Sequence, residues 1–144
     1  MNIGTKSVLF GVHQFAIHPL FVLRAWWICY RSWPTLAEFC AILTHDLGYW
    51  GCPDMDGSEG EEHPERIARI WRGGIFRWFP SFGNEVAAIV IGHSRFHAAR
   101  SGLPLSKLFR PDKLATALYP HWLYLLMGNL SGEIHEYIGH CKDG

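Results

Sequence analysis

Glycine and proline divide this chain into apolar segments of helical length, and none of these segments alternates in the way that a β-strand requires. Pro19 suits the first turn of a helix, where its missing N–H costs no hydrogen bond. Thr35 and Glu38 have the spacing of a capping box, so a second helix is expected to start at Thr35. That helix is expected to run to about Leu47 and to end at Gly48.

The remaining segments extend the helical pattern to the C-terminus. Further helices are expected at residues 64–72, 85–100 and 106–118, with an interruption at Pro111, and one or two more are expected in residues 119–144. Residues 48–62 are rich in glycine and acidic side chains and are expected to form a loop. The chain has 144 residues, close to the commonest domain size, and 49% of them are hydrophobic. The sequence therefore predicts an all-α fold, a single-domain helical bundle over residues 1–144.

The charge balance and the apolar stretches limit the partners of the chain. Lys and Arg number 13, as do Asp and Glu, so a general nucleic-acid binder, which needs a basic face against phosphates, is not expected. A small anionic substrate in one local pocket is compatible with this balance. The most apolar stretch is interrupted by Arg24 and is too short to span a bilayer. The four cysteines form no CxxC pair, which favours free thiols and a cytoplasmic location.

Imidazole and carboxylate side chains recur from one expected helix to the next. The chain has nine histidines, and the candidates for a shared site are His18, His45, Asp46, His63, His93 and Asp112. A lone histidine in a helical protein is usually a surface or core residue, but a bundle that aims several such groups at one point builds a metal site. Mixed imidazole and carboxylate ligands suit Zn, Fe, Mn, Co or Ni better than Ca, which prefers oxygen.

The order of these residues resembles the HD-domain metal-dependent phosphohydrolase superfamily. The signature of that family is a His, then an adjacent His-Asp pair, then a distant Asp on successive helices, and many members add two histidines before the last Asp. The matching segments are "HPLFVLRAW", "THDLGYWG", "EEHPE", "GHSRFHAA" and "RPDKLA". The resemblance covers about residues 13–118, implies a helical bundle of the HD type, and leaves the helical extension 119–144 without a counterpart.

The resemblance implies one or two divalent ions, the first held by His18, His45, Asp46 and Asp112 and the second by Asp46, His63 and His93. It also implies hydrolysis of a nucleotide or other small phosphate ester by a hydroxide that a bound ion generates from water. Asp46 and His45 would be catalytic, while Arg95 and Lys113 would bind the phosphate. Lys113 is also suited to orient Asp112. Residues 48–50 stand where nucleotidase members often carry a glutamate, which argues against a deoxynucleoside-monophosphate specificity.

Several alternatives fit the same residues. His13 could replace His18, and His97, expected on the same helix face as His93, could be a substitute ligand, a partner of a ligand or a phosphate contact. Some relatives of this fold bind two irons at the same positions and use O₂ for oxidative cleavage, and a non-catalytic interaction domain with a tryptophan-rich surface is the other alternative. A homo-oligomer is compatible with the sequence. The histidines expected in structural or surface positions are His121, His135 and His140.

Overall fold

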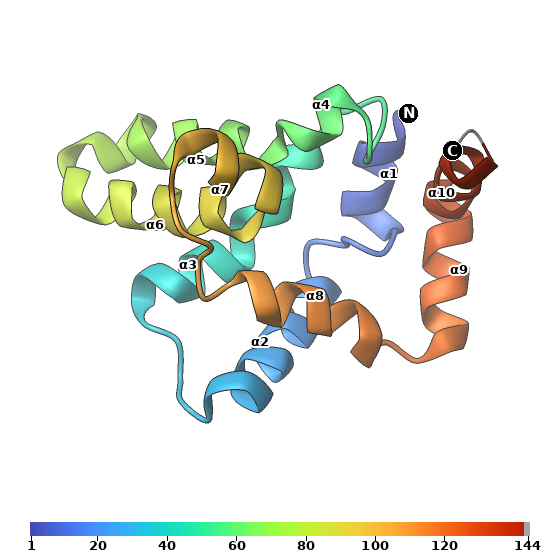
Figure 1. The fold of residues 1–144 in the computed structure, drawn as a ribbon, viewed down its shortest axis with the longest axis horizontal. Helices are drawn as coiled ribbons and strands as arrows, with labels where there is room; N and C mark the ends of the chain where they lie inside the picture. The colour runs from blue at the N-terminus through green and yellow to red at the C-terminus, as the bar shows by residue number, and fades with distance from the viewer. Residues whose placement is uncertain (143–144) are drawn as a thin grey trace.

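The structure is built of helices joined by short links (Figure 1). It is a computed structural model that describes residues 1–142, apart from the side chains of residues 75, 76, 140 and 142. This range contains no strand, which confirms the predicted all-α fold. The side chain of His140, expected at a structural or surface position, lies outside the described side chains.

Some helices pack against the next α-helix of the chain, and others pack against helices that are distant in sequence. The α-helices are α1 (Ile3–Phe10), α2 (Ile17–Tyr30), α3 (Leu36–Thr44), α4 (Ser58–Glu61), α5 (His63–Arg72), α6 (Pro80–His93), α7 (Arg95–Ser101), α8 (Phe109–Leu118), α9 (His121–Ser131) and α10 (Glu133–Lys142), and the 3₁₀ helices are η1 (His45–Tyr49) and η2 (Gly74–Trp78). α5 packs along α6, α2 along α8, and α3 against α6. α9 packs against α1. In Figure 1, α9 and α10 lie at the right of the molecule, and the α5–α6 pair extends to the left.

The main core lies where α2, α3, α5, α6 and α8 meet. Apolar side chains recur every three or four positions on these helices, which gives each helix one buried stripe. The buried set includes Val22, Ala25, Trp26, Ala41, Ile42, Ile67, Ala68, Val86, Val90 and Ala115. A smaller cluster of Val12, Tyr119 and Met127 ties α9 to the link between α1 and α2. The helical period of the sequence therefore accounts for the main core.

Helix α3 begins as predicted and ends earlier than predicted. The Thr35 hydroxyl accepts from the Glu38 N–H at 3.2 Å, and the Glu38 carboxylate accepts from the Thr35 N–H at 2.8 Å, which confirms the capping box. The α-helix ends at Thr44, and His45 Nδ1 donates to the carbonyl of Ile42. In a continued α-helix the N–H of Asp46 would donate to that carbonyl oxygen. The chain instead tightens into η1, so the expectation that the His-Asp pair ends an α-helix is wrong.

The helix predicted over residues 85–100 is two helices. α6 ends at His93, Ser94 is extended with φ −93° and ψ 124°, and α7 begins at Arg95. The Ser94 hydroxyl caps α7 by accepting from the His97 N–H, a local bond that competes with continuation of the helix. The expectation that His93 and His97 share one helix face is therefore wrong.

The remaining predicted helices agree with the structure in part. Pro111 lies in the first turn of α8, where its missing N–H is tolerated, so the predicted interruption is wrong. The C-terminal segment forms two helices, in line with the predicted one or two. Helices α1, α4 and η2 have no counterpart among the predicted segments, and α4 is a single turn inside the expected loop. Among the described residues, no helix is long and apolar enough to cross a membrane.

Gly48 allows η1 to approach α5, and its replacement tests that contact. A Cβ at Gly48 would overlap the backbone carbonyl of His63, and a backbone group cannot move aside as the end of a side chain can. We expect Gly48→Ala to lower the free energy of unfolding by about 1–3 kcal/mol, measured by urea denaturation. Because the contact joins η1 to the start of α5, the variant should also separate Asp46 from His63.

Gly139→Ala is the matched control, because no neighbouring segment lies within 4 Å of a Cβ at that exposed position of α10. Alanine favours a helix over glycine, so this variant should be as stable as the wild type or more stable by about 0.5–1 kcal/mol. Equal stability of Gly48→Ala and the wild type would contradict close packing of η1 on α5.

Candidate metal centre

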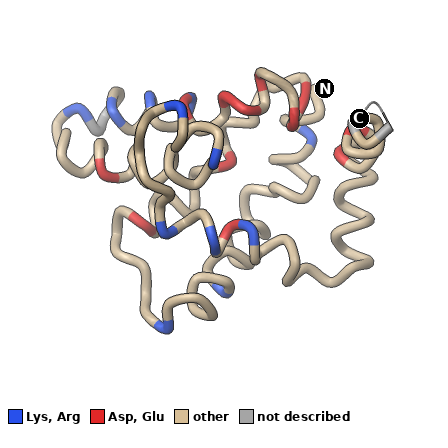
Figure 2. The backbone as a smooth tube through the Cα atoms, viewed as in Figure 1, with Lys and Arg blue, Asp and Glu red and all other residues tan. Residues whose placement is uncertain are grey.

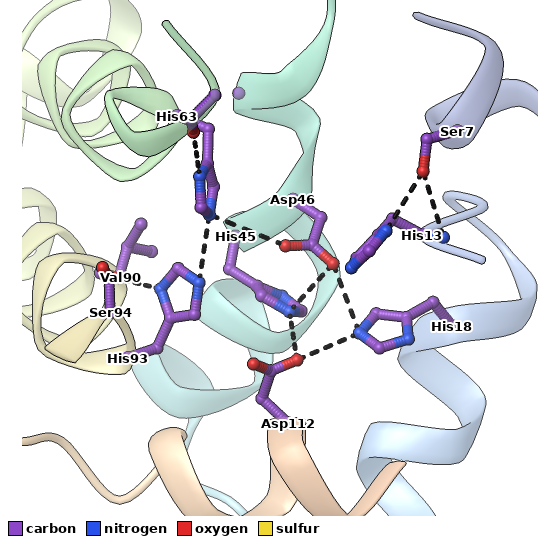
Figure 3. Close-up of polar contacts among 12 residues, drawn as sticks. Ser7, His13, His18, His45, Asp46, His63, Val90, His93, Ser94 and Asp112 are labelled. Atoms are coloured by element: carbon purple, nitrogen blue, oxygen red, sulfur yellow. Dashed lines mark hydrogen bonds and ion pairs between the residues drawn. The ribbon is translucent and has the colours of Figure 1, made fainter. Parts of the chain in front are cut away.

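Four buried side chains from three parts of the chain converge on one point (Figure 3). His18 comes from the first turn of α2, His45 and Asp46 come from η1, and Asp112 comes from the first turn of α8. One ligand atom of each lies within 4.8 Å of the ligand atoms of the other three. The packing of α2 along α8 is what brings His18 to Asp112 across 94 positions of sequence.

The distances in this first group match those between the ligands of one metal ion. Asp46 Oδ2 lies 3.2 Å from His18 Nε2 and 3.3 Å from His45 Nε2. Asp112 Oδ1 lies 3.1 Å and 3.4 Å from the same two nitrogens. Ligands on bonds of about 2.1 Å are about 3.0 Å apart in an octahedron and about 3.4 Å apart in a tetrahedron. The group therefore has the dimensions that a transition metal ion requires.

A second group shares Asp46 with the first. His63 opens α5 and His93 closes α6, so the packing of these helices places the two imidazoles together. Their Nε2 atoms are 3.2 Å apart, and His63 Nε2 lies 3.9 Å from Asp46 Oδ1. Asp46, His63 and His93 each offer an atom within 4.8 Å of the others. The two oxygens of Asp46 thus face different groups of imidazoles.

The imidazoles are held so that Nε2 is left as an electron-pair donor. Three of them donate Nδ1–H to a backbone carbonyl three residues earlier: His45 to Ile42, His63 to Gly60 and His93 to Val90. A neutral imidazole carries one ring N–H, so its use at Nδ1 leaves Nε2 unprotonated. This arrangement is typical of histidines that bind a metal.

His18 is held by Tyr119, a residue that the sequence analysis missed. The Tyr119 hydroxyl donates to the carbonyl of Val12 at 2.9 Å, and its oxygen lies 3.5 Å from His18 Nδ1. Because its hydrogen is used on Val12, that oxygen can accept from Nδ1–H of His18. The two rings are stacked with an interplanar angle of 15°. No motif marks Tyr119, because its partner lies 101 positions away.

The environment of Asp46 Oδ2 is the strongest indication that this site could bind a cation. It is buried and accepts no hydrogen bond from the residues that the structure describes, although two imidazole nitrogens lie close to it. An unsatisfied buried carboxylate oxygen is costly and calls for an ion or a water molecule. The mixed nitrogen and oxygen donors suit a divalent transition metal. The buried His/Asp cluster could therefore hold a metal, whose identity and number these donors leave open.

The electrostatics also favour a positive charge at this point. Burial alone raises the pKa of Asp46, but nearby imidazoles, His45 first, hold it well below its ordinary value. Burial also raises the pKa of Asp112, and the close approach of His18 and His45 lowers it by more. Burial lowers the pKa of His45, but the carboxylates of Asp46 and Asp112, with the bond to Ile42, together raise it above its ordinary value. Both carboxylates are therefore ionised, and protons compete with a metal for the imidazole nitrogens.

The imidazoles of the second group are neutral at pH 7. Burial, followed by the charge of His93, holds the pKa of His63 well below its ordinary value. Burial, followed by the charge of His45, lowers the pKa of His93 to about 4. Tyr49 stacks on His63 with 3.8 Å between ring centroids, which covers one face of that imidazole. These two histidines can bind a metal without first losing a proton.

A cavity of about 400 Å³ gives access to both groups, a volume in the range that binds small organic ligands. Members of both groups line it, together with the aromatic side chains of Tyr49, Phe96 and Phe109. Basic positions lie on α7 and α8, and acidic positions gather around α4 (Figure 2). The cavity lining includes two basic side chains, Arg95 and Lys113, and four acidic ones, Asp46, Asp56, Glu61 and Asp112.

Both predicted phosphate-binding residues line this cavity. The Arg95 guanidinium lies 5.6 Å from the centroid of the Phe109 ring, and no carboxylate among residues 1–142 forms an ion pair with it. Lys113 Nζ lies 3.2 Å from Asp112 Oδ2, and that carboxylate raises the pKa of the lysine. This geometry fits the expectation that Lys113 orients Asp112, and it leaves Arg95 as the cation available to an anionic ligand.

His13 lies beside the first group without belonging to it. Its ring centroid is 5.4 Å from that of His18, but neither ligand group found among the described residues includes it. Its Nδ1 lies 3.3 Å from a carboxylate oxygen of Glu133. Burial lowers its pKa, and the charges of Asp46 and Glu133 outweigh that effect and raise the pKa to about 9. The sequence pattern does not mark Glu133 as part of this region.

His97 holds the turn that precedes the second group. Its Nε2–H donates to the carbonyl of Glu61, just before the chain reaches His63. Glu61 is not among the candidate ligands, so this contact is none of the three roles considered for His97. The histidines His121 and His135 are exposed, as expected.

Comparison with known proteins adds nothing to this geometry. No family model matches the chain, and no curated protein or solved structure matches it either.

Purified protein should carry up to two metal ions per chain, and the double variant His63→Ala/His93→Ala should lose the second. The first substitution removes the His63 nitrogen that faces Asp46 Oδ1, and the second removes the His93 nitrogen that lies beside it. Elemental analysis after dialysis measures the metal content, with the exposed His121→Ala as the matched control. Full metal content in the double variant would show that these two histidines are not ligands.

The metal-free protein should lose stability as the pH falls from 6.5 towards 4. The pKa of His93 is lowered from 6.5 to about 4 in the folded chain, so the unfolded chain takes up this proton first. The stability that the neutral ring contributes is present above pH 6.5 and decreases below it, by up to about 3 kcal/mol. His93→Gln should flatten this pH dependence in urea denaturation with a chelator present. An equal slope in variant and wild type would contradict the lowered pKa.

Proposed function

We propose that this chain is a metal-dependent phosphohydrolase of the HD-domain type, with a single domain over residues 1–144, that acts on a nucleotide or another small phosphate ester. The observation that carries the proposal is the position of Asp46 between two groups of imidazoles. One of its oxygens faces His18 and His45, and the other faces His63. Asp46 could therefore be a ligand in both groups, and a site that held two ions would orient a phosphate and offset its charge.

The residues of the site fit the chemistry of phosphate-ester hydrolysis. When bound, a divalent ion lowers the pKa of a water molecule from about 15.7 to about 7 and offsets the charge of the phosphate. Asp46 and His45 are the proposed catalytic residues. The bond from His45 Nδ1 to the Ile42 carbonyl, 3.0 Å long, fixes the direction in which Nε2 points. The other proposed ligands are His18, His63, His93 and Asp112.

Basic and aromatic side chains support a phosphate ester as the substrate. Arg95 and Lys113 line the cavity, and a guanidinium can bind two phosphate oxygens at once. Phe96 and Phe109 offer apolar ring faces on which a nucleoside base could stack. The cavity volume of about 400 Å³ suits a small molecule. Zn, Mn, Fe, Co and Ni all suit the proposed ligands.

A phosphate-release screen tests the proposal directly. Metal-free protein is loaded separately with Zn, Mn, Fe, Co or Ni and is offered a panel of nucleotides and phosphomonoesters, with and without O₂. We expect phosphate release with a redox-inert metal and in the absence of O₂. Turnover that requires both iron and O₂ would favour the di-iron oxygenase, and absence of turnover with every metal would favour a non-catalytic interaction domain.

Asp46→Asn should lower kcat for a substrate from this screen by at least about 100-fold, a barrier increase of about 2.7 kcal/mol. The amide keeps the size of the carboxylate and removes the charge that offsets the cations. The variant should stay folded, but without metal it should melt at a lower temperature, because the charge that is lost is one that the surrounding imidazoles stabilise. Added Mn²⁺ should raise the melting temperature of the wild type more than that of the variant.

Glu85→Gln provides the matched control, because it removes one negative charge from an exposed position of α6. Its kcat and its response to Mn²⁺ should equal those of the wild type. If kcat of Asp46→Asn stays within about threefold of this control, a barrier change of about 0.7 kcal/mol, Asp46 is not a catalytic residue.

A further inference from the structure

Glu133, at the start of α10, holds a side chain of the cavity wall. His13 lies in the link between α1 and α2 and lines the cavity. Its Nδ1 lies 3.1 Å from the Ser7 hydroxyl and 3.3 Å from Glu133 Oε2. The other nitrogen of the ring points toward Asp46 (Figure 3). Because polar partners at one ring nitrogen fix the direction of the other, Glu133 and Ser7 together determine how His13 faces the metal centre.

The carboxylate of Glu133 is built into this position. Its Oε1 accepts from the Val12 N–H at 3.1 Å and from the Ser131 hydroxyl at 2.7 Å. The side chain is only 13% exposed. A Cβ at Gly11 would overlap this carboxylate, so glycine at that position is what lets the carboxylate approach. A nearly buried carboxylate with several partners is a fixed part of the structure.

Glu136, one turn further along α10, holds a second part of the wall. Its Oε1 accepts from the backbone N–H of Met55 at 2.8 Å and from that of Asp56 at 3.1 Å. Both residues line the cavity and belong to a segment with no helix of its own. These bonds join positions 81 and 80 apart in sequence. The loop therefore takes its place in the wall from α10.

We infer that α10 positions the substrate: Glu133 orients His13, and Glu136 fixes the Met55–Asp56 backbone, so that both shape the cavity around an anion held at the centre. The inference deepens the proposed function and rests on it. None of the candidate ligands among the described residues comes from α9 or α10. Substitutions on α10 should therefore change the binding of an anion and leave the binding of metal unchanged.

The kinetic test uses Glu133→Gln and Glu136→Gln in the full chain, with Glu85→Gln as the control on α6. We expect each α10 variant to raise KM for the substrate of the screen about tenfold and to keep kcat within about threefold. Metal content should equal that of the wild type. A loss of metal in the α10 variants, or an unchanged KM, would overturn the inference.

A double-mutant cycle separates positioning of His13 from a general loss of structure. If Glu133 acts through His13, then Glu133→Gln should change KM little in a His13→Gln background, because the two changes affect one interaction. Glu136→Gln should still raise KM in that background. Fully additive effects of Glu133→Gln and His13→Gln would overturn the positioning role.

Binding of inorganic phosphate to the Mn²⁺-loaded protein separates this inference from the proposed function. Calorimetry should give a dissociation constant about tenfold higher in Glu133→Gln than in the wild type and in Glu85→Gln. If the wild type hydrolyses a substrate but phosphate affinity is equal in all variants, the inference falls and the proposed function stands. If the wild type hydrolyses nothing but phosphate affinity depends on Glu133, the proposed function falls, and only the part of the inference that concerns anion binding stands. No phosphate binding by the wild type would also overturn the inference.

Discussion

Two ionised carboxylates buried among imidazoles are the constraint on which the rest of the structure depends. Asp46 and Asp112 are buried, and the pKa of each is held well below its ordinary value. Two negative charges buried together are costly unless a positive charge offsets them. The neighbouring imidazoles have their Nδ1 hydrogens directed at oxygen acceptors, so they can offset this charge only by taking a proton or sharing a cation at Nε2. The site is therefore suited to hold a cation.

The ends of helices supply the side chains of this site. α3 gives way to η1 at His45, α5 begins at His63, α6 ends at His93, and Asp112 lies in the first turn of α8. The last carbonyls of a helix lack partners within it, so they are free to accept from a side chain. His45 and His93 use carbonyls of this kind, those of Ile42 and Val90. Ending the helix and aiming the imidazole are therefore one structural event.

Local patterns made the all-α fold and the capping box at Thr35 predictable, because the helical period and the cap spacing are visible in a short window. The candidate ligands were chosen instead from the order of six residues between His18 and Asp112. The break at Ser94 was not predictable in this way, because the apolar period continues through it and the cap becomes visible only in the folded chain. Tyr119 and Glu133 were missed because their partners, His18 and Val12, lie 101 and 121 positions away. Such contacts depend on tertiary packing, for which the sequence shows no spacing.

Anomalous diffraction from crystals grown with Mn²⁺ tests the central claim most directly. The claim is that the buried His/Asp cluster holds a metal. It predicts an anomalous peak about 2.0–2.3 Å from the Nε2 atoms of His18 and His45 and from carboxylate oxygens of Asp46 and Asp112. Well-ordered side chains in this arrangement with no anomalous peak between them, at a Mn²⁺ concentration that produces peaks elsewhere in the crystal, would contradict it.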